Sequence, residues 1–295
     1  KPMEPLELTF GLRYDDIRFD IGDKFLADGD DSDNTSFNKV SPMAGLVYAL
    51  HSHAQFYANI STAFETPTTT EFARADGGGG INADLKVQQA TNYELGLRGD
   101  IYGRHGYELA VFRIDLEDEL VPFEVPGRPG RDFYVNAGSS TRSGLELSLH
   151  SEPLEGLRFT ASYTYSRFTF DEFIDDNGNE FSGNDIPGVP RHYGFLEALY
   201  RHGTGLFVAL DAQYVGSLYV NNANSESTAA YWLSNLRLGF KRRYGQVVFE
   251  PFVGINNLAG NAYSGNIRIN AFGGRYYEPG PGRNGYGGFA LAYEF

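Results

Sequence analysis

The sequence predicts an all-β fold, a transmembrane antiparallel β-barrel, from three observations. Apolar and polar residues alternate with period 2 along about twelve segments, as they do in strands with one apolar face. The connections between these segments are alternately short and long. Aromatic residues make up 15% of the 295 residues and there are 36 Gly, a composition that suits pleated strands and turns. No helical period of useful length competes with this interpretation.

The predicted strands differ in how regular their alternation is. The clearest ones cover residues 6–14, 93–101, 144–149, 157–165, 206–214 and 289–295. Less regular ones cover residues 44–50, 55–62, 107–116, 192–200, 232–240 and 247–255. Residues 107–116 change parity, which we interpret as a β-bulge. Pro251 stands inside a predicted strand, where it would remove a ladder hydrogen bond, and the pattern does not explain it.

The lengths of the connections predict how the barrel lies in the membrane. The short ones are residues 51–53, 103–106, 151–156, 202–205 and 244–245. The long ones are residues 20–38, 65–90, 117–132, 171–190, 216–229 and 260–284. Outer-membrane barrels have tight periplasmic turns, long external loops and an even strand number. Twelve strands therefore place both chain ends on the periplasmic side.

The charged residues of the strands predict which face meets lipid. Large apolar side chains share one face of each clear strand, and the opposite face carries Glu94, Arg98, Glu146, Asp211 and Arg237. An Arg facing hydrocarbon at the midplane costs about 2 to 4 kcal/mol, so these charges are expected to face the lumen. The acidic and Gly-rich stretches of the long connections are expected to lie in water and to bury no core.

Composition excludes several other classes. The net charge of −14 argues against a nucleic-acid partner, because phosphates require a basic surface. The absence of Cys excludes disulfides, zinc–thiolate sites and a cysteine nucleophile. No stretch approaches the 18 or so apolar residues of a membrane-spanning helix. The chain starts at Lys1 without a signal-peptide pattern, so either a leader has been removed or the chain is a fragment.

Several stretches resemble the C-terminal barrel region of TonB-dependent outer-membrane receptors, in the family's order. They are "YANISTAFETPTTTEF" (57–72), "QATNYELGLRG" (89–99), "FYVNAGSSTRSGLELSL" (133–149), "GNDIPGVPRH" (183–192), "FVGINNLAGNAY" (252–263), "RYYEPGPGR" (275–283) and the final "GGFALAYEF" (287–295). The "TPTTTEF" form is similar to the siderophore-receptor-like branch. The end of the chain also resembles the family's signal for the barrel-assembly machinery, at Phe289, Leu291, Tyr293 and Phe295.

The resemblance implies a plugged barrel of about 22 strands in the outer membrane of a Gram-negative bacterium. Residues 1–295 would be its C-terminal portion, without the plug domain, the first strands or the N-terminal segment that binds TonB. It implies active uptake of a scarce solute, most often a ferric siderophore, with no enzymatic chemistry and no cofactor at the barrel wall. The alternative is a self-contained barrel of about twelve strands that serves as a translocator, pore or lipid hydrolase.

Candidate ligand contacts come from the long connections and the mouth of the lumen. Arg offers a planar fork for an anionic iron chelate, and aromatic rings offer flat apolar area. The residues that qualify by position are Arg128, Arg131, Tyr219, Trp232, Arg268, Arg275, Tyr276, Tyr277 and Arg283. No metal site is expected, because residues 175–186 start like a calcium loop but lack its required Gly and final Glu. No combination of Ser, His and an acidic residue in the sequence indicates a catalytic site.

Overall fold

A computed structural model describes residues 5–27, 29–124, 132–136, 138–175 and 178–294. Its main sheet has 13 strands, of which β14 and the short β15 (Arg242–Tyr244) are successive parts of one pass, so the wall has twelve passes. The long strands are β1 (Leu6–Ile21), β2 (Asp33–His51), β3 (Ala54–Glu65), β4 (Gln88–Ile101), β5 (His105–Glu117), β8 (Ser139–Leu154), β9 (Leu157–Glu172), β10 (His192–Arg201), β11 (Leu206–Val215), β14 (Tyr231–Phe240), β16 (Val247–Asn256) and β19 (Asn284–Tyr293). Each predicted strand overlaps one of them, so the all-β prediction is confirmed.

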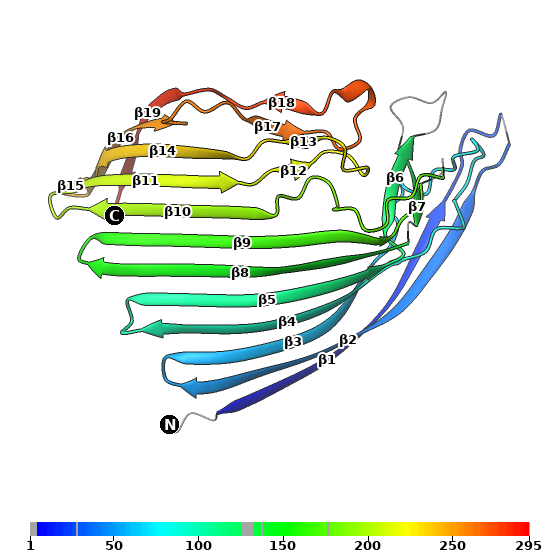
Figure 1. Ribbon diagram of the computed structural model, residues 1–295, viewed down its shortest axis with the longest axis horizontal. Coiled ribbons are helices and arrows are strands. Elements are labelled where there is room, and N and C mark those ends of the chain that lie inside the picture. Colours follow the sequence, from blue (N-terminus) through cyan, green and yellow to red (C-terminus); the bar gives the residue numbers. More distant parts are fainter. Residues whose placement is uncertain (1–4, 28, 125–131, 137, 176–177, 295) are drawn as a thin grey trace.

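The strands form an antiparallel meander with its short and long connections at opposite ends. The short turns lie at one end together with both ends of the chain, and the long connections gather at the other (Figure 1). The long connections carry small hairpins: β6 (Leu120–Glu124) with β7 (Asp132–Asn136), β12 (Leu218–Tyr219) with β13 (Ser227–Thr228), and β17 (Ser264–Ile267) with β18 (Tyr277–Pro279). The one described helical element is the 3-10 turn η1 (Phe272–Gly274). No helix in the described part of the chain is long and apolar enough to cross a bilayer.

The sheet curves but does not close. In the described part of the chain β1 pairs only with β2, and β19 pairs only with β16. A self-contained barrel of twelve strands needs β1 and β19 to pair with each other. The open sheet is therefore a partial barrel, as the prediction of a portion of a larger barrel requires.

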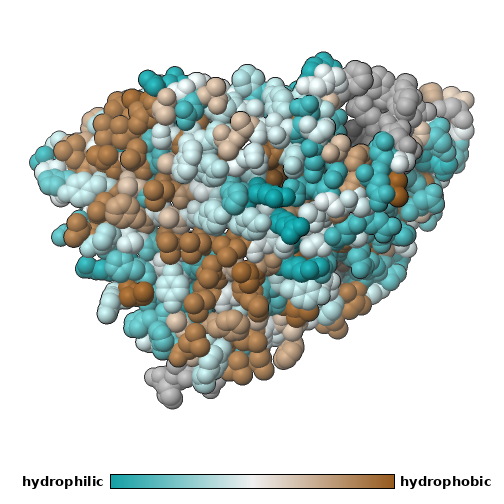
Figure 2. Space-filling view, viewed as in Figure 1, coloured by the Kyte–Doolittle hydropathy of each residue, from teal (hydrophilic) through white to brown (hydrophobic). Residues whose placement is uncertain are grey.

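The pairing registers separate two continuous faces. One lateral row runs through Leu8, Leu46, Ala58, Leu95 and Val111, each directly opposite the next on neighbouring strands, and it continues through Leu145 to Tyr165. We call this the outward face. Apolar side chains gather over much of the wall, whereas hydrophilic ones dominate the end with the long connections (Figure 2).

The predicted lumen charges occupy the opposite, inward face. Glu94 lies between the partners Asn59 and Phe112, one position along from the outward row, and Glu146 follows Leu145 in the same way. Because side chains alternate between faces along a strand, this register places both carboxylates inward. The same parity holds for Arg98, Asp211 and Arg237.

The polarity of the two faces inverts near the end with the long connections. On β1 the outward face is apolar up to Tyr14, and it then carries Asp16 and Arg18, while the inward face turns apolar at Phe19 and Ile21. On β5 the outward Val111 is followed by Arg113 and Asp115, and the inward face carries Phe112, Ile114 and Leu116. The β4–β5 and β5–β8 ladders run without a register shift, so the bulge predicted in residues 107–116 is wrong. The parity change marks where the strands leave hydrocarbon for water.

Pro251 lies where the ladder between β14 and β16 is interrupted. Gly239 pairs with Phe252 and Arg242 pairs with Phe249, but no pairs form between these two. The Pro251 carbonyl oxygen faces Gly239, so its missing N–H also faces β14. The sheet thus tolerates an internal proline by dividing β14 from β15 without changing register.

The long connections bury two small cores, contrary to expectation. Phe72, Ile81 and Leu85 pack with the partly buried Phe19, Ile21, Phe37 and Leu120, and we call this group the Phe72 cluster. Phe170 and Phe173 form a second group with Val121, Phe181 and Ile186. These cores consist of apolar residues that are spaced among polar ones. A prediction based on the average composition of each connection does not detect them.

Candidate functional site

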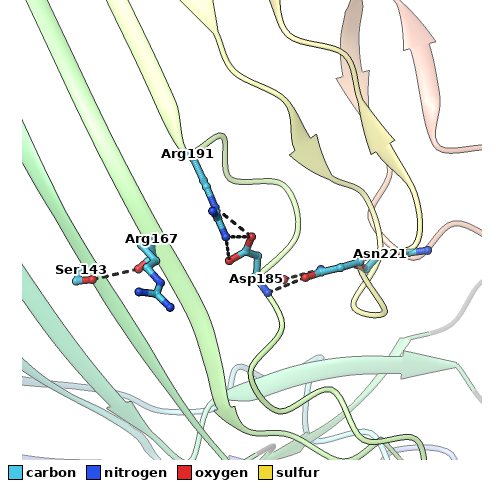
Figure 3. A network of polar contacts seen from close by, with 6 residues as sticks. Ser143, Arg167, Asp185, Arg191 and Asn221 are labelled. Atoms are coloured by element: carbon cyan, nitrogen blue, oxygen red, sulfur yellow. Dashed lines mark hydrogen bonds and ion pairs between the residues drawn. The ribbon is translucent and has the colours of Figure 1, made fainter.

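Three connections at the outer end of the wall bind one another through asparagine and aspartate side chains. We call residues 173–191, 216–230 and 257–283 the three-loop assembly. Arg191 donates to both carboxylate oxygens of Asp185, at 2.7 and 2.9 Å (Figure 3). The Asp185 backbone N–H donates to Asn224 Oδ1 at 2.7 Å, and Asn224 Nδ2 returns a bond to the Asp185 carbonyl at 2.8 Å. The first and second loops are therefore joined by reciprocal bonds.

The third loop joins the second through Asn270. Its backbone N–H donates to the Val220 carbonyl at 3.0 Å, and its side-chain oxygen accepts from the Asn222 N–H at 2.9 Å. Tyr277 Oη donates to the Ser227 carbonyl at 3.1 Å. These bonds hold the three-loop assembly as one folded unit.

Sequence reasoning missed these asparagines as organising residues. Asn224, Asn257 and Asn270 all have φ between 51° and 55°, the left-handed region that Asn tolerates better than most residues. Asn257 is nearly fully buried and exchanges bonds with Asn261 at 2.8 and 2.9 Å. The only signal in the sequence was the density of Asn in residues 221–224 and 256–261.

Four of the predicted ligand contacts lie in or beside the hairpins of this assembly. Tyr219 is half-buried, and its carbonyl accepts the Gly188 N–H at 2.8 Å. The rings of Tyr276 and Tyr277 lie 5.9 Å apart, edge to face. Arg268 donates to Glu278 at 2.7 Å. Hydrogen bonds from Asn266 and Arg268 lower the pKa of Glu278, so the Arg268 charge is neutralised within its own hairpin.

Two further predicted arginines lie in the third loop of the assembly, and the other predicted residues are dispersed. Arg275 follows η1 and is exposed, and Arg283 is exposed with its guanidinium beside Gly260. Trp232 faces outward against Tyr214, with ring centroids 4.7 Å apart, as an interface residue does. Arg128 and Arg131 lie outside the described residues. Of the predicted assembly signal, Phe289, Leu291 and Tyr293 form an exposed outward row on β19, and Phe295 lies outside the described residues.

The inward face combines carboxylates with flat-lying aromatic rings. The Tyr57 ring covers Gly96 and the Phe112 ring covers Gly144, and a side chain at either glycine would collide with the ring. Tyr57 Oη donates to Glu108 at 3.2 Å. Arg237 lies 4.3 Å from the Phe252 ring centroid and 4.0 Å from Glu250. Rings lying against the wall leave the concave side free for another body.

No group of three or more His, Asp or Glu side chains in the described ranges is placed to hold a metal ion. Carboxylates of the long connections instead bind backbone and arginine groups. The carboxylate of Asp185, at the end of the calcium-loop-like stretch, is bound by Arg191.

Asp33 ties the connection between β3 and β4 to the start of β2. Its carboxylate accepts the Ile81 N–H at 3.0 Å and the Asn34 N–H at 2.8 Å. These bonds, the one from Ile81 foremost, lower the pKa of Asp33. Ile81 belongs to the Phe72 cluster, so this contact helps to dock the loop.

Docking through Asp33 is expected to depend on pH. A carboxylate with a lowered folded-state pKa stabilises above its unfolded pKa of about 3.9, and the stabilisation is lost as pH falls through the lower folded value. In the full-length receptor, the Ile81 amide should therefore stay protected from hydrogen exchange from neutral pH to below that unfolded value, after correction for intrinsic rates. Asp33→Asn should remove protection already at neutral pH. The Asp30 carboxylate accepts the Ser32 N–H within its own loop. Asp30→Asn is therefore the matched control and should leave the Ile81 amide protected. Equal protection in all three proteins would refute the assignment.

A wall with an apolar outward belt, a charged inward face and folded loops at one end defines a segment of an outer-membrane β-barrel. The chain belongs to the family described as "TonB dependent receptor-like, beta-barrel", whose model matches residues 1–258. Members of this family are integral proteins of the Gram-negative outer membrane. The predicted family and location are therefore confirmed.

Individual relatives agree with this family. The chain is 25% identical over 275 residues to the "Probable TonB-dependent siderophore receptor PiuA" of Acinetobacter baumannii, covering 87% of this chain and 35% of that protein. It is 26% identical over 217 residues to the "Catecholate siderophore receptor Fiu" of Escherichia coli, covering 70% of this chain and 27% of that protein. The chain thus spans about a third of the length of these curated relatives. Among solved structures, the copper transporter OprC superposes with a TM-score of 0.77 at 16% identity, covering 100% of this chain and 46% of that protein, a likeness of fold alone.

Proposed function

We propose that this chain forms part of the barrel wall of a transporter that takes up a ferric siderophore across the outer membrane. Energy would reach it from the inner membrane through TonB, which would engage an N-terminal segment outside these 295 residues. The plug domain and the first strands of the barrel would also lie outside them.

The observation that carries the proposal is the family match over residues 1–258 together with relatives named as siderophore receptors. The fold by itself does not select the solute, because a copper transporter shares it. The free concave side of the wall supports a place for a plug. The barrel wall is proposed to hold no cofactor and to do no covalent chemistry.

The proposed ligand contacts are arginines and tyrosines of the three-loop assembly, of which Arg275, Tyr277 and Arg283 are exposed and Tyr276 is half-buried. Tyr276 and Tyr277 present two rings together, and Arg275 and Arg283 are both exposed nearby in the chain. Such groups suit an anionic, partly aromatic iron chelate. Arg268 is a weaker candidate, since Glu278 already occupies its guanidinium. Tyr219, Arg128 and Arg131 remain proposals on position alone.

Other partners follow from the outward surface. The apolar belt would contact outer-membrane lipid, and the row of Phe289, Leu291 and Tyr293, with Phe295, would be read by the barrel-assembly machinery. No nucleic-acid partner is proposed.

Binding and growth assays with the full-length receptor test the proposal. The receptor should bind a ferric chelate from a panel that also contains copper and cobalamin, and should support growth on it as sole iron source. Tyr276→Ala with Arg283→Ala should weaken binding by about 1 to 2 kcal/mol if these are central contacts. Tyr102→Ala, at an 84% exposed position in a turn at the opposite end, is the control and should bind as wild type does. Binding of another nutrient, with none of any ferric chelate, would reject the siderophore and keep the transporter.

A further inference from the structure

An apolar groove lies on the outward face close to the short turns. It is an open recess of about 700 Å³ lined by residues of β10, β11, β14 and β16. Most of its lining side chains belong to the outward parity: Tyr200, Leu206, Val208, Leu238, Phe240, Pro251 and Val253. A separate polar pocket lined by Glu197, Arg237 and Glu250 lies on the inward face behind it. The groove therefore opens toward the membrane, and the lumen lies on the other side of the wall.

The interruption at Pro251 accounts for the position of the groove. The pairs that would join Phe240 and Lys241 to β16 are absent. Pro251 and Val253 are short, whereas Tyr200, Leu206 and Phe240 are long side chains around them. A ladder break bordered by long side chains leaves a recess that the neighbouring residues do not fill.

Two residues beyond the lining residue Phe240, the outward face carries Arg242, which has no carboxylate partner among the described residues. Arg242 follows Phe240 by two residues on the same face, about 7 Å nearer the short turns. Its guanidinium carbon lies 5.7 Å from the centre of the Tyr244 ring, and no carboxylate in the described part of the chain neutralises it. By contrast, the adjacent Arg243 pairs with Glu294 at 2.5 Å, and Lys241 pairs with Glu250 at 3.6 Å. His202 lines both this groove and the inward pocket, and its Nδ1 contacts Thr204 Oγ1 at 2.8 Å.

We propose that this groove seats one acyl chain of an anionic phospholipid of the inner leaflet, with its phosphate at Arg242 and His202. The apolar recess faces hydrocarbon, and the unneutralised cation stands at the depth of the headgroups on the periplasmic side. An acyl chain fits an apolar recess open along one side, and a phosphate complements the charge at its end. The inference rests on the membrane orientation of the wall and is independent of the solute that the receptor transports.

Native mass spectrometry of the full-length receptor tests the proposal, with phosphatidylglycerol and phosphatidylcholine as the lipid probes. Wild type, released from mixed bilayers into mild detergent, should retain a phosphatidylglycerol molecule in preference to phosphatidylcholine. Leu238→Trp fills the groove and should lose the retained lipid, and Val208→Phe is a second filling variant in case the first does not assemble. Leu210→Trp changes a neighbouring outward position that does not line the groove and should retain it.

The headgroup contact is tested separately. Arg242→Gln should abolish the preference for phosphatidylglycerol over phosphatidylcholine, whereas Arg104→Gln, in another turn at the same end, should leave it intact. Equal retention by wild type and both filling variants would overturn the proposal. The proposal would also be overturned if the wild-type receptor retained only detergent, or if a second protein were bound over the groove. Uptake assays on the same variants separate this site from the transport function, since loss of lipid does not require loss of ligand binding.

Discussion

Leu147→Arg is expected to prevent stable insertion of the receptor, with a loss of about 2 to 4 kcal/mol in the free energy of unfolding from the bilayer. Leu147 lies on the outward face of β8, between Leu109 and Tyr163 on the neighbouring strands. It is the middle residue of the outward apolar run Leu145, Leu147 and Leu149, so the guanidinium would meet hydrocarbon far from either interface. Urea unfolding of the full-length receptor from phospholipid vesicles measures the loss directly, and the amount of folded receptor in outer membranes should fall with it.

Ser148→Arg is the matched control, one residue along the same strand. Ser148 faces inward and lies opposite Glu108, so the new cation would sit in the polar lumen beside a carboxylate. This variant should insert and unfold much as wild type does. If Arg is tolerated equally at both positions, or if the wild-type protein is soluble without detergent, the assignment of the outward face to lipid is wrong.

The same two faces decide how much of the fold could be predicted. Within the membrane the lipid imposes a strict alternation, so the segment predicted at residues 157–165 begins where β9 begins, at Leu157, although β9 continues to Glu172. Beyond the membrane the requirement reverses. The inward face of β1 becomes apolar at Phe19 and Ile21, because a loop packs against it there. The outward face becomes charged at Asp16 and Arg18, because it faces water there and no longer lipid. A single alternation rule therefore ended β1 seven residues early, at Tyr14, and took the same inversion on β5 for a bulge.

The candidate site was less predictable, because its bonds join residues that are far apart in sequence. Asp185 and Asn224, 39 residues apart, exchange bonds between side chain and backbone, and no periodicity announces such a pair. Residue type and loop position placed Tyr276 and Tyr277 in a long connection, and the structure has them beside and in the hairpin strand β18. They did not reveal that Glu278, ten residues from Arg268, neutralises that arginine. A loop arginine is available to a ligand only if no carboxylate of its own hairpin neutralises it. The sequence alone does not show such a pairing.

The outer end of the wall is thus a folded layer with its own cores. The Phe72 cluster joins the connection between β3 and β4 to the extended ends of β1 and β2, and the three-loop assembly joins the loops on the other side. Loops held in this way present side chains with little conformational freedom left to lose, which lowers the entropic cost of binding a ligand. Loosening one of them should therefore weaken binding even where the altered residue never touches the ligand.

Phe72→Ala is the variant expected to loosen this layer most. Phe72 is 1% exposed, and its ring centroid lies 5.1 Å from that of Phe19 and 6.3 Å from that of Phe37. Removing a buried Phe side chain costs about 3 to 5 kcal/mol. Because the Phe72 cluster lies beyond the apolar belt, that cost should fall on docking of residues 66–87 and leave the barrel itself intact. Hydrogen exchange in the full-length receptor should show loss of protection at Ile81 and Leu85, with the amides of β8 and β9 unchanged.

Phe25→Ala separates the effect of burial from that of removing any loop phenylalanine. Phe25 is 67% exposed in the connection between β1 and β2, so its truncation should leave exchange of residues 66–87 unchanged. If Phe72→Ala also leaves them protected, the cluster does not hold the loop. If it instead lowers the free energy of unfolding of the whole barrel by the full amount, docking is coupled to the wall. The outer layer would then contribute to the stability of the barrel as well as to the proposed binding surface.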